Sequence, residues 1–323
     1  RSRGYPVKYY EDVLHDPAQR DPRGFILPAD QPDFPTAVKF VNTLIKNGVA
    51  VHQAVSDFQV NGTSYPAGSL VVQCAQAFRP HIMDMFEPQY YPDDTQYPGG
   101  PPRPPYDSAG YTLAFQMGVE FDRILDGFDG PFEEVNGILE PPAGEVIDPN
   151  AEGFMLSPDF CDAFIVINRL LEQDLPVYRT IRDFSDNGCR FPPGTIYIPA
   201  AQSALDILQT AAQDLGLTFQ GVDFTAPPAM VNIHSVRVGL WDQYGGSMAS
   251  GWVRWLLEQF EFDFDVVHPP RLDAGGLHKD FDVIIFVDRA IPGTDDSGSR
   301  HRRYAPIEPE TVPEKYRSRL GQI

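Results

Sequence analysis

The chain has 323 residues, of which 42% are hydrophobic and 12% aromatic. This length and composition suffice for two or three domains with apolar cores, and they exclude a wholly disordered chain. The formal net charge of −20 has the wrong sign for a nucleic-acid surface, and no apolar stretch approaches the roughly 20 residues of a membrane span, so we expect neither nucleic-acid binding nor a membrane span.

The first predicted elements belong to a segment that occurs twice. Residues 42–76 align without a gap onto residues 168–202, with 11 of the 35 positions identical, and Gly24–Leu27 is similar to Gly153–Leu156 upstream. In each copy a short apolar strand precedes a helix whose apolar residues recur close to the 3.6-residue period, and a second strand follows. An Asn-Gly turn then leads toward a returning strand. The pattern predicts an internally duplicated α/β module, most simply a sheet covered by helices.

Segments rich in proline and glycine separate the two copies. Residues 87–105 are predicted to be a surface linker, because their prolines exclude a helix. A helix-like stretch at residues 111–119 and a second Pro/Gly-rich passage at residues 130–149 are predicted to be connectors on the module surface. We therefore expect the first module, with its Pro/Gly-rich tail, at residues 1–107 and a connector helix with the second copy at residues 108–228.

A third α/β unit is predicted at residues 229–323. Its expected elements are a strand at 236–241, a helix at 251–260, and strands at 264–267 and 283–287. The unbroken apolar run of the last strand is typical of a buried parallel strand. This order fits part of a doubly wound, flavodoxin-like or amidotransferase-like domain.

Cysteine and histidine positions give no metal-binding motif. Cys74, Cys161 and Cys189 have no CxxC or other ligand spacing, so we expect thiols packed in the core and no structural zinc site. Among the seven histidines only His81 has an acidic residue three positions further on, Asp84. We interpret His81 as a packed or solvated side chain near a helix start, and we predict no metal ligands in this chain.

The loop at residues 242–251 is the main candidate site, and its candidate ligand-binding residues are Gly245, Gly246, Ser247 and Ser250. Three interpretations stay open. Backbone N–H groups beside the glycines could cradle a small anion at the helix N-terminus. The sequence Gly245–Ala249 approximates the GxSxG elbow of a serine hydrolase, with Ala in place of the last Gly. Alternatively, the glycines form a turn and one of the two serines caps the helix.

Six long motifs stand out along the chain: Gly24-Phe25-Ile26-Leu27-Pro28-Ala29-Asp30-Gln31, Ala77-Phe78-Arg79-Pro80-His81, Met85-Phe86-Glu87-Pro88-Gln89, Tyr97-Pro98-Gly99-Gly100-Pro101-Pro102, Pro105-Tyr106-Asp107 and Gly239-Leu240-Trp241-Asp242-Gln243-Tyr244-Gly245-Gly246-Ser247-Met248. Together they resemble the region that follows the catalytic domain in large bacterial proteins of the zinc carboxypeptidase family. In that family the third unit is similar to a class I glutamine amidotransferase-like domain. No cysteine follows Cys189, so the nucleophile of amidotransfer has no counterpart here.

The resemblance implies a parent activity, the removal of C-terminal residues from peptides by a zinc-bound water. The family's HxxE zinc ligands, its later histidine and its general-base glutamate match no position in this sequence, so no catalytic residue is carried over. The chain also begins without an apolar leader, and residues 314–319 are typical of a helix start, so we expect a piece of a longer protein.

The sequence therefore predicts a non-catalytic accessory region that serves interdomain packing or substrate presentation. The resemblance implies that its partners are its own upstream catalytic domain and a peptide substrate, that zinc is bound only in that domain, and that the protein is secreted or periplasmic. Two alternatives remain: a stand-alone module that binds a small anion through residues 242–251, and a cryptic serine hydrolase with Ser247 as nucleophile.

Overall fold

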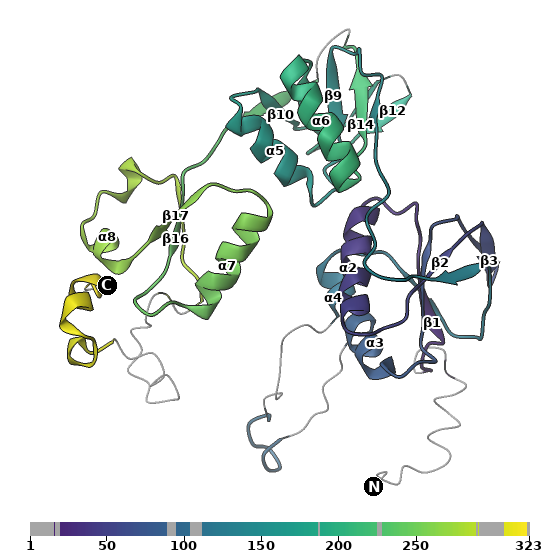
Figure 1. The fold of residues 1–323 in the computed structure, drawn as a ribbon, viewed down its shortest axis with the longest axis horizontal. Helices are drawn as coiled ribbons and strands as arrows, with labels where there is room; N and C mark the ends of the chain where they lie inside the picture. The colour runs from purple at the N-terminus through teal and green to yellow at the C-terminus, as the bar shows by residue number, and fades with distance from the viewer. Residues whose placement is uncertain are drawn as a thin grey trace. The chain divides into compact units, whose positions relative to one another are not determined.

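A computed structural model describes residues 16, 20–88, 95–103, 112–186, 188–224, 228–288, 290 and 307–321. Within these residues the chain is a mixed α/β protein, as the sequence predicts (Figure 1). It divides into two units. Unit 1 comprises Arg1–Glu145, Asp159–Cys161 and Ala212–Leu217, and unit 2 comprises Val146–Pro158, Asp162–Ala211 and Thr218–Ile323. None of the helices in the described ranges has the length and apolar content needed to cross a bilayer.

The first sheet has five antiparallel strands in the order β6-β1-β5-β2-β7. The strands are β1 (Gly24–Leu27), β2 (His52–Ala54), β5 (Leu70–Gln73), β6 (Asp122–Ile124) and β7 (Phe132–Glu134). Three helices accompany them, α2 (Phe34–Lys46), α3 (Arg79–Phe86) and α4 (Leu113–Gln116), together with a hairpin of β3 (Phe58–Val60) and β4 (Thr63–Tyr65). Helix α2 begins where the Asp33 carboxylate accepts the N–H of Thr36 at 3.1 Å, as expected of an N-cap.

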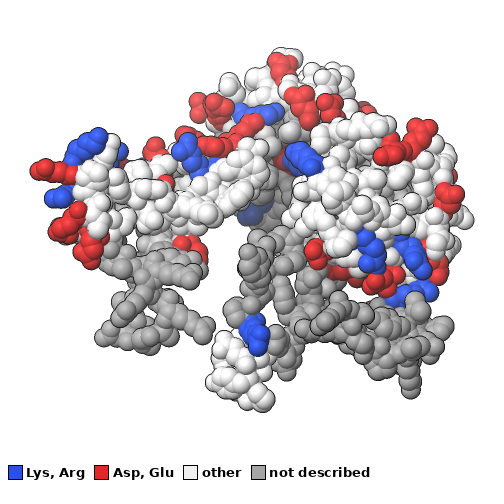
Figure 2. All heavy atoms as spheres, turned by 60° about the horizontal axis from the view of Figure 1, so that its bottom comes forward, with Lys and Arg blue, Asp and Glu red and all other residues white. Residues whose placement is uncertain are grey.

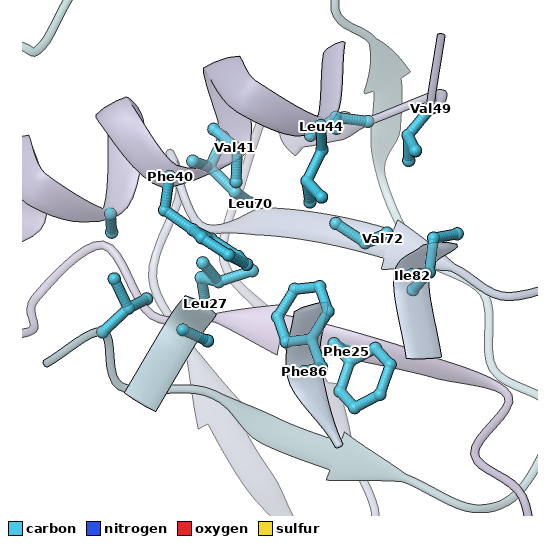
Figure 3. Packing of buried hydrophobic residues seen from close by; sticks show 14 of the residues in the cluster. Phe25, Leu27, Phe40, Val41, Leu44, Val49, Leu70, Val72, Ile82 and Phe86 are labelled. Carbon is cyan, nitrogen blue, oxygen red and sulfur yellow. The ribbon is translucent and has the colours of Figure 1, made fainter. Parts of the chain in front are cut away.

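The main core of unit 1 lies between this sheet and helices α2 and α3 (Figure 3). Phe40 and Leu44 of α2 follow the helical period, so both reach the sheet and are fully buried. From α3, Phe86 stacks on Phe25 of β1, with ring centroids 4.1 Å apart. The opposite face of the sheet is covered by the β3–β4 hairpin, whose Phe58 and Tyr65 join a second apolar cluster.

The second sheet has the order β15-β10-β13-β9-β14-β8. Its elements are β8 (Val146–Ile147), β9 (Gly153–Leu156), α5 (Ala163–Glu172), β10 (Val177–Thr180), β11 (Phe184–Asp186), β12 (Cys189–Phe191), β13 (Ile196–Pro199), α6 (Gln202–Leu215), β14 (Phe219–Val222) and β15 (Met230–Ile233). All neighbours are antiparallel except the short β8, which runs parallel to β14. Without β8, the order read from the other end is β14-β9-β13-β10-β15. These strands correspond in turn to β6, β1, β5, β2 and β7 of the first sheet.

Details of the two sheets also correspond. Residues aligned in the sequence pair in the same register, since Phe25 faces Val72 across one sheet and Phe154 faces Ile198 across the other. The hydroxyls of Ser69 and Thr195 each donate to a proline carbonyl three residues earlier, both at 2.7 Å. In the first hairpin Asn61 and Gly62 have φ of 52° and 86°, as a tight Asn-Gly turn requires. The two sheets are thus alike in strand order and in these contacts, and the internal duplication stays a prediction from the sequence.

The first sheet extends beyond the boundary at residue 107 that the sequence suggests. Strands β6 and β7 and helix α4 join the first module, although their residues were assigned to the second copy or to surface connectors. The two strands have three residues each, with the sequences DRI and FEE. Such short edge strands of mixed polarity carry too little periodic signal to be found from sequence.

The third sheet is parallel, with the order β17-β16-β18. Its elements are β16 (Val238–Trp241), α7 (Met248–Gln259), β17 (Phe264–Val267), α8 (Pro269–Asp273), η1 (Leu277–Lys279) and β18 (Val283–Ile285), followed by η3 (Pro309–Thr311) and η4 (Glu314–Arg319). Figure 1 shows α7 and α8 on opposite sides of this sheet. The parallel pairing and the two-sided cover fit the predicted partial doubly wound unit.

Two expectations about burial are wrong. The strand expected at residues 283–287 ends at Ile285 and is an edge strand of a three-stranded sheet, so Val283 is exposed. Cys74 is buried as expected, but Cys161 and Cys189 are exposed. Both lie at loops or edges, where the local sequence gives no burial signal.

Candidate functional site

The candidate loop lies at the carboxyl end of β16, the central strand of the parallel sheet. The chain continues from β16 to β17 on one side and later to β18 on the other, so the strand order reverses at β16. In open α/β sheets, ligands bind at the carboxyl ends of the strands where the order reverses. The position of the loop is therefore that of a ligand site, and its internal contacts decide what it can bind.

The Asp242 carboxylate organises the loop from within. Its Oδ1 atom accepts the N–H groups of Gln243 and Ser247, each at 2.8 Å. Gly245 and Gly246 have φ of 86° and 82°, and the Gly246 N–H donates to the carbonyl of Gln243 at 2.9 Å. The glycines thus supply left-handed turn conformations, which residues with a side chain rarely adopt.

The two candidate serines hold the start of helix α7. Ser247 is its N-cap, and its Oγ accepts the N–H of Ser250 at 3.3 Å. Ser250 is buried, and its hydroxyl donates to the carbonyl of Trp241 at 2.7 Å. The structure therefore brings Gly245, Gly246, Ser247 and Ser250 into one turn, and the hydrogen bonds of the Ser247 and Ser250 side chains stabilise the turn itself.

These contacts disfavour both the anion-binding loop and the nucleophilic elbow of a serine hydrolase. An anion bound among the loop N–H groups would meet the Asp242 carboxylate, which already accepts two of them. A nucleophilic serine needs a base, but the partner of His268 Nδ1 is the Asp242 carbonyl oxygen, 3.3 Å away. Ser247 also has extended backbone angles, φ −117° and ψ 129°, and not the strained turn of an elbow. The capping interpretation explains all of these observations.

Metal-binding side chains do not cluster in the described part of the chain, where no group of three or more His, Cys, Asp or Glu residues could hold an ion. His81 and Asp84 both lie on α3, and the Asp84 carbonyl accepts the N–H of Thr112 at 2.7 Å. The Nε2 atom of His81 is buried without a hydrogen bond in the described structure.

The outer side of helix α7 is apolar. Here four apolar side chains, which we call the α7 face, are exposed: Met248 at 85%, Trp252 at 63%, Trp255 at 49% and Leu256 at 48%. The rings of the two tryptophans pack edge to face, with centroids 6.1 Å apart. Their spacing of three and four residues places them on one side of the helix.

The inner side of α7 is apolar as well. Val253, Leu257 and Phe260 are spaced by four and three residues and are partly buried, and the helix contacts β16. The apolar arc of α7 thus covers more than half of the helix circumference. A helix that packs against a core with one side usually has a narrower apolar stripe. This breadth is a sequence signal that could have identified a second contact surface.

The sheet beside α7 is incompletely covered. Trp241 packs with Leu272 of α8 on one side of the sheet, and the alternating residue Leu240 faces the other side, where α7 lies. The residues paired with β16 on that second side include Val266 of β17 and Val283 of β18, which are both exposed. Helix α7 therefore covers the central strand and leaves apolar side chains open on both neighbouring strands.

Comparisons of the chain with protein-family models, with curated proteins and with solved structures each find no match. The class that the fold and the site define is a mixed α/β protein with one antiparallel sheet, a similar sheet that is antiparallel except for β8, and a small parallel sheet.

Proposed function

We propose that this chain is a non-catalytic accessory region of a zinc carboxypeptidase-like protein, and that its α7 face packs against the catalytic domain of that protein. The exposure of the α7 face is the observation that carries the proposal. The resemblance of the sequence motifs supplies the kind of partner, a secreted or periplasmic peptidase that removes C-terminal residues from peptides.

The composition of the α7 face supports a protein partner. Tryptophan and methionine are enriched at the centres of protein interfaces, and charged residues form the rim. Along the side of α7, Arg254 and Glu258 form an ion pair at 2.8 Å. All four side chains are exposed by about half or more of their surface, and such apolar patches on monomers are often functional.

The charge of the molecule argues against a lipid surface as the occupant. Helices that lie on anionic membranes carry several basic residues on their polar side. Helix α7 has one basic residue, Arg254, which is paired with Glu258, and the whole chain has a net charge of −20. Repulsion between the acidic chain and anionic lipids favours a folded protein domain.

The complete reading frame that encodes this chain provides the test. We expect it to encode a domain with an HxxE motif and a later histidine. In that complete protein, the amide hydrogens of α7 should exchange more slowly than in the 323-residue chain, because the α7 face is covered. A frame without such a domain, or equal exchange of α7 in both proteins, would contradict the proposal.

Two matched variants of the complete protein separate docking from folding. Trp252→Glu with Leu256→Glu places charges on the α7 face and should abolish the extra protection of α7. Phe115→Glu changes a side chain of unit 1 that is also exposed, at 58%, and should leave the extra protection of α7 intact.

The 323-residue chain with added zinc should release no C-terminal residue from a peptide. Release that copurifies with the chain would show that the chain itself is catalytic.

A further inference from the structure

Within unit 2, helix α5 of the second sheet contacts the turn that follows α7. The side-chain amide of Asn168 donates to the carbonyl of Phe260 at 2.8 Å. Next to it, Arg169 forms a bidentate pair with Glu261, at 2.8 Å from Nε and 2.7 Å from Nη2. Such a pair fixes orientation as well as distance, because both groups are planar.

Aromatic contacts extend this junction by one turn of α5. Phe164 lies one helical turn before Asn168 and is 54% exposed, yet its ring meets two aromatic rings of the α7 turn. It approaches Phe260 edge to face, with centroids 6.5 Å apart, and it lies 6.3 Å from Phe262 at a tilt of 40°. Backbone, charge and aromatic contacts therefore meet over the three consecutive residues of the turn.

The turn itself is strained at the residue that makes the ion pair. After the C-cap Phe260, the N–H of Phe262 reaches the carbonyl of Leu257 at 2.9 Å, which is the bond of a Schellman motif. Glycine is preferred at the next position after the cap, but Glu261 stands there with φ of 56°. The Arg169 hydrogen bonds hold the pKa of the Glu261 carboxyl below its usual range. A strained residue that persists where its side chain is bound points to a role for that side chain.

The first sheet has an equivalent contact. Asn42 of α2 is the residue that aligns with Asn168, and it also binds the backbone of a downstream segment. Its amide donates to the carbonyl of Leu139 at 2.9 Å, and its Oδ1 accepts the Leu139 N–H at 2.9 Å. The asparagine at the same helix position therefore hydrogen-bonds to the backbone of a downstream segment in both modules, although the two segments differ in sequence.

We infer that helix α5 is a docking surface for the third sheet's domain, in which Phe164, Asn168 and Arg169 receive the turn Phe260–Phe262 and hold that domain against the second module. The partner is a helix-ending turn with an acidic residue in the left-handed conformation. This inference goes beyond the proposed function and does not depend on what covers the α7 face.

A distance measurement tests the docking directly. Spin labels are placed on the native Cys189 and on Ala274→Cys, both exposed, in a chain that carries Cys161→Ser. Cys74 is buried and stays unlabelled. The distance distribution between the labels should be narrow in this background and broad after Arg169→Glu. The double exchange Arg169→Glu with Glu261→Arg should make it narrow again.

The matched control is Arg254→Glu, which breaks an ion pair inside α7 without touching the junction. It should leave the distribution narrow. Circular dichroism of each variant shows whether the chain is folded, and the rescue by the double exchange separates lost docking from lost folding. A broad distribution in the starting background, or an unchanged narrow one after Arg169→Glu, would overturn the inference.

Glu261→Gly provides a second, independent test. Glycine relieves the left-handed strain, so the end of α7 should be no less ordered, as judged by hydrogen exchange of residues 256–260. The carboxylate that binds Arg169 is lost, so the distance distribution should broaden. If the distribution stays narrow in this variant, the ion pair does not hold the domains.

Discussion

At the scale of single residues, the hydroxyl of Tyr65 joins the β3–β4 hairpin to strand β6. It donates to Oδ2 of Asp122 at 2.7 Å, and burial together with this hydrogen bond raises the pKa of Tyr65. We expect Tyr65→Phe to lower the free energy of unfolding by about 1 kcal/mol, which is the net contribution of a typical hydrogen bond. Urea denaturation at neutral pH measures this change.

The pH dependence of the same variant follows from the raised pKa. A folded pKa above the unfolded value means that the neutral hydroxyl stabilises the fold fully below the unfolded pKa of about 10. This contribution is lost as the pH rises through the folded value. The stability of the unchanged protein should therefore fall more steeply above about pH 10 than that of Tyr65→Phe; parallel curves would contradict the assignment.

The three cysteines should differ in reactivity. Burial raises the pKa of the Cys74 thiol to about 11, whereas Cys161 and Cys189 are exposed. Since the thiolate is the reactive form, a thiol reagent at neutral pH should modify two cysteines quickly and the third only after denaturation. Cys161→Ser with Cys189→Ser is the control and should show no fast reaction. Three fast thiols in the native protein would contradict the burial of Cys74.

At the scale of elements, two glycines of the third sheet's domain should respond oppositely to alanine. A Cβ atom at Gly239 would lie 2.8 Å from Cγ2 of Val267 and 3.1 Å from the Phe281 ring. We expect Gly239→Ala to destabilise the domain by about 1–3 kcal/mol, the usual cost of overpacking.

Gly251 is the matched control. It lies within helix α7, and a Cβ atom there would meet nothing within 4 Å. Alanine is the better helix former, so Gly251→Ala should stabilise the domain by up to about 1 kcal/mol. Chemical denaturation followed by tryptophan fluorescence measures both variants, because Trp241 is buried in this domain and becomes exposed on unfolding. Equal effects of the two changes would contradict the packing around β16.

Elements with a strong local signal were predictable from the sequence. The apolar period of α2, the Asn-Gly turn at Asn61-Gly62 and the strand of β17 all depend on neighbouring residues, and each is present in the structure. Strands β6 and β7 were missed because three residues at a sheet edge have no pattern of their own. The register with β1 and β2 is what makes them strands.

The candidate loop was found from its glycines and serines, but its chemistry was not. Asp242 precedes these residues and was not among the candidates, yet its carboxylate accepts two of the loop's N–H groups. The breadth of the apolar arc of α7 could have indicated a second contact surface, but the sequence does not say which side of the helix is buried. The structure shows that α7 contacts β16 with one side while both tryptophans are exposed on the other.

At the scale of the whole molecule, the net charge of −20 is the dominant electrostatic property. In Figure 2 the acidic and basic side chains of the described residues are interspersed over the visible surface, with uncharged areas between them. The isolated ion pairs at such a surface contribute little, so the sum of repulsions between acidic groups should govern how stability changes with salt.

Added salt should therefore stabilise the protein. Raising sodium chloride from about 20 to about 300 mM shortens the screening length to less than 10 Å, which weakens repulsion between distant carboxylates. We expect the thermal midpoint to rise by a few degrees, measured by calorimetry at neutral pH. A midpoint that falls with salt would show that local ion pairs, such as Arg237–Asp282, outweigh the net charge.

The small parallel sheet has a further consequence for the behaviour of the protein at high concentration. Its outer strands β17 and β18 both carry exposed valines, and a strand edge with apolar side chains can recruit strands of other molecules into a growing aggregate. Each edge also has an acidic gatekeeper, Asp265 within β17 and Asp282 directly before β18. Because the Arg237 guanidinium holds the pKa of Asp282 far below its usual range, that gatekeeper keeps its charge even in acidic surroundings. The acidic residues at these two strands should therefore limit self-assembly through the exposed valines of the small parallel sheet.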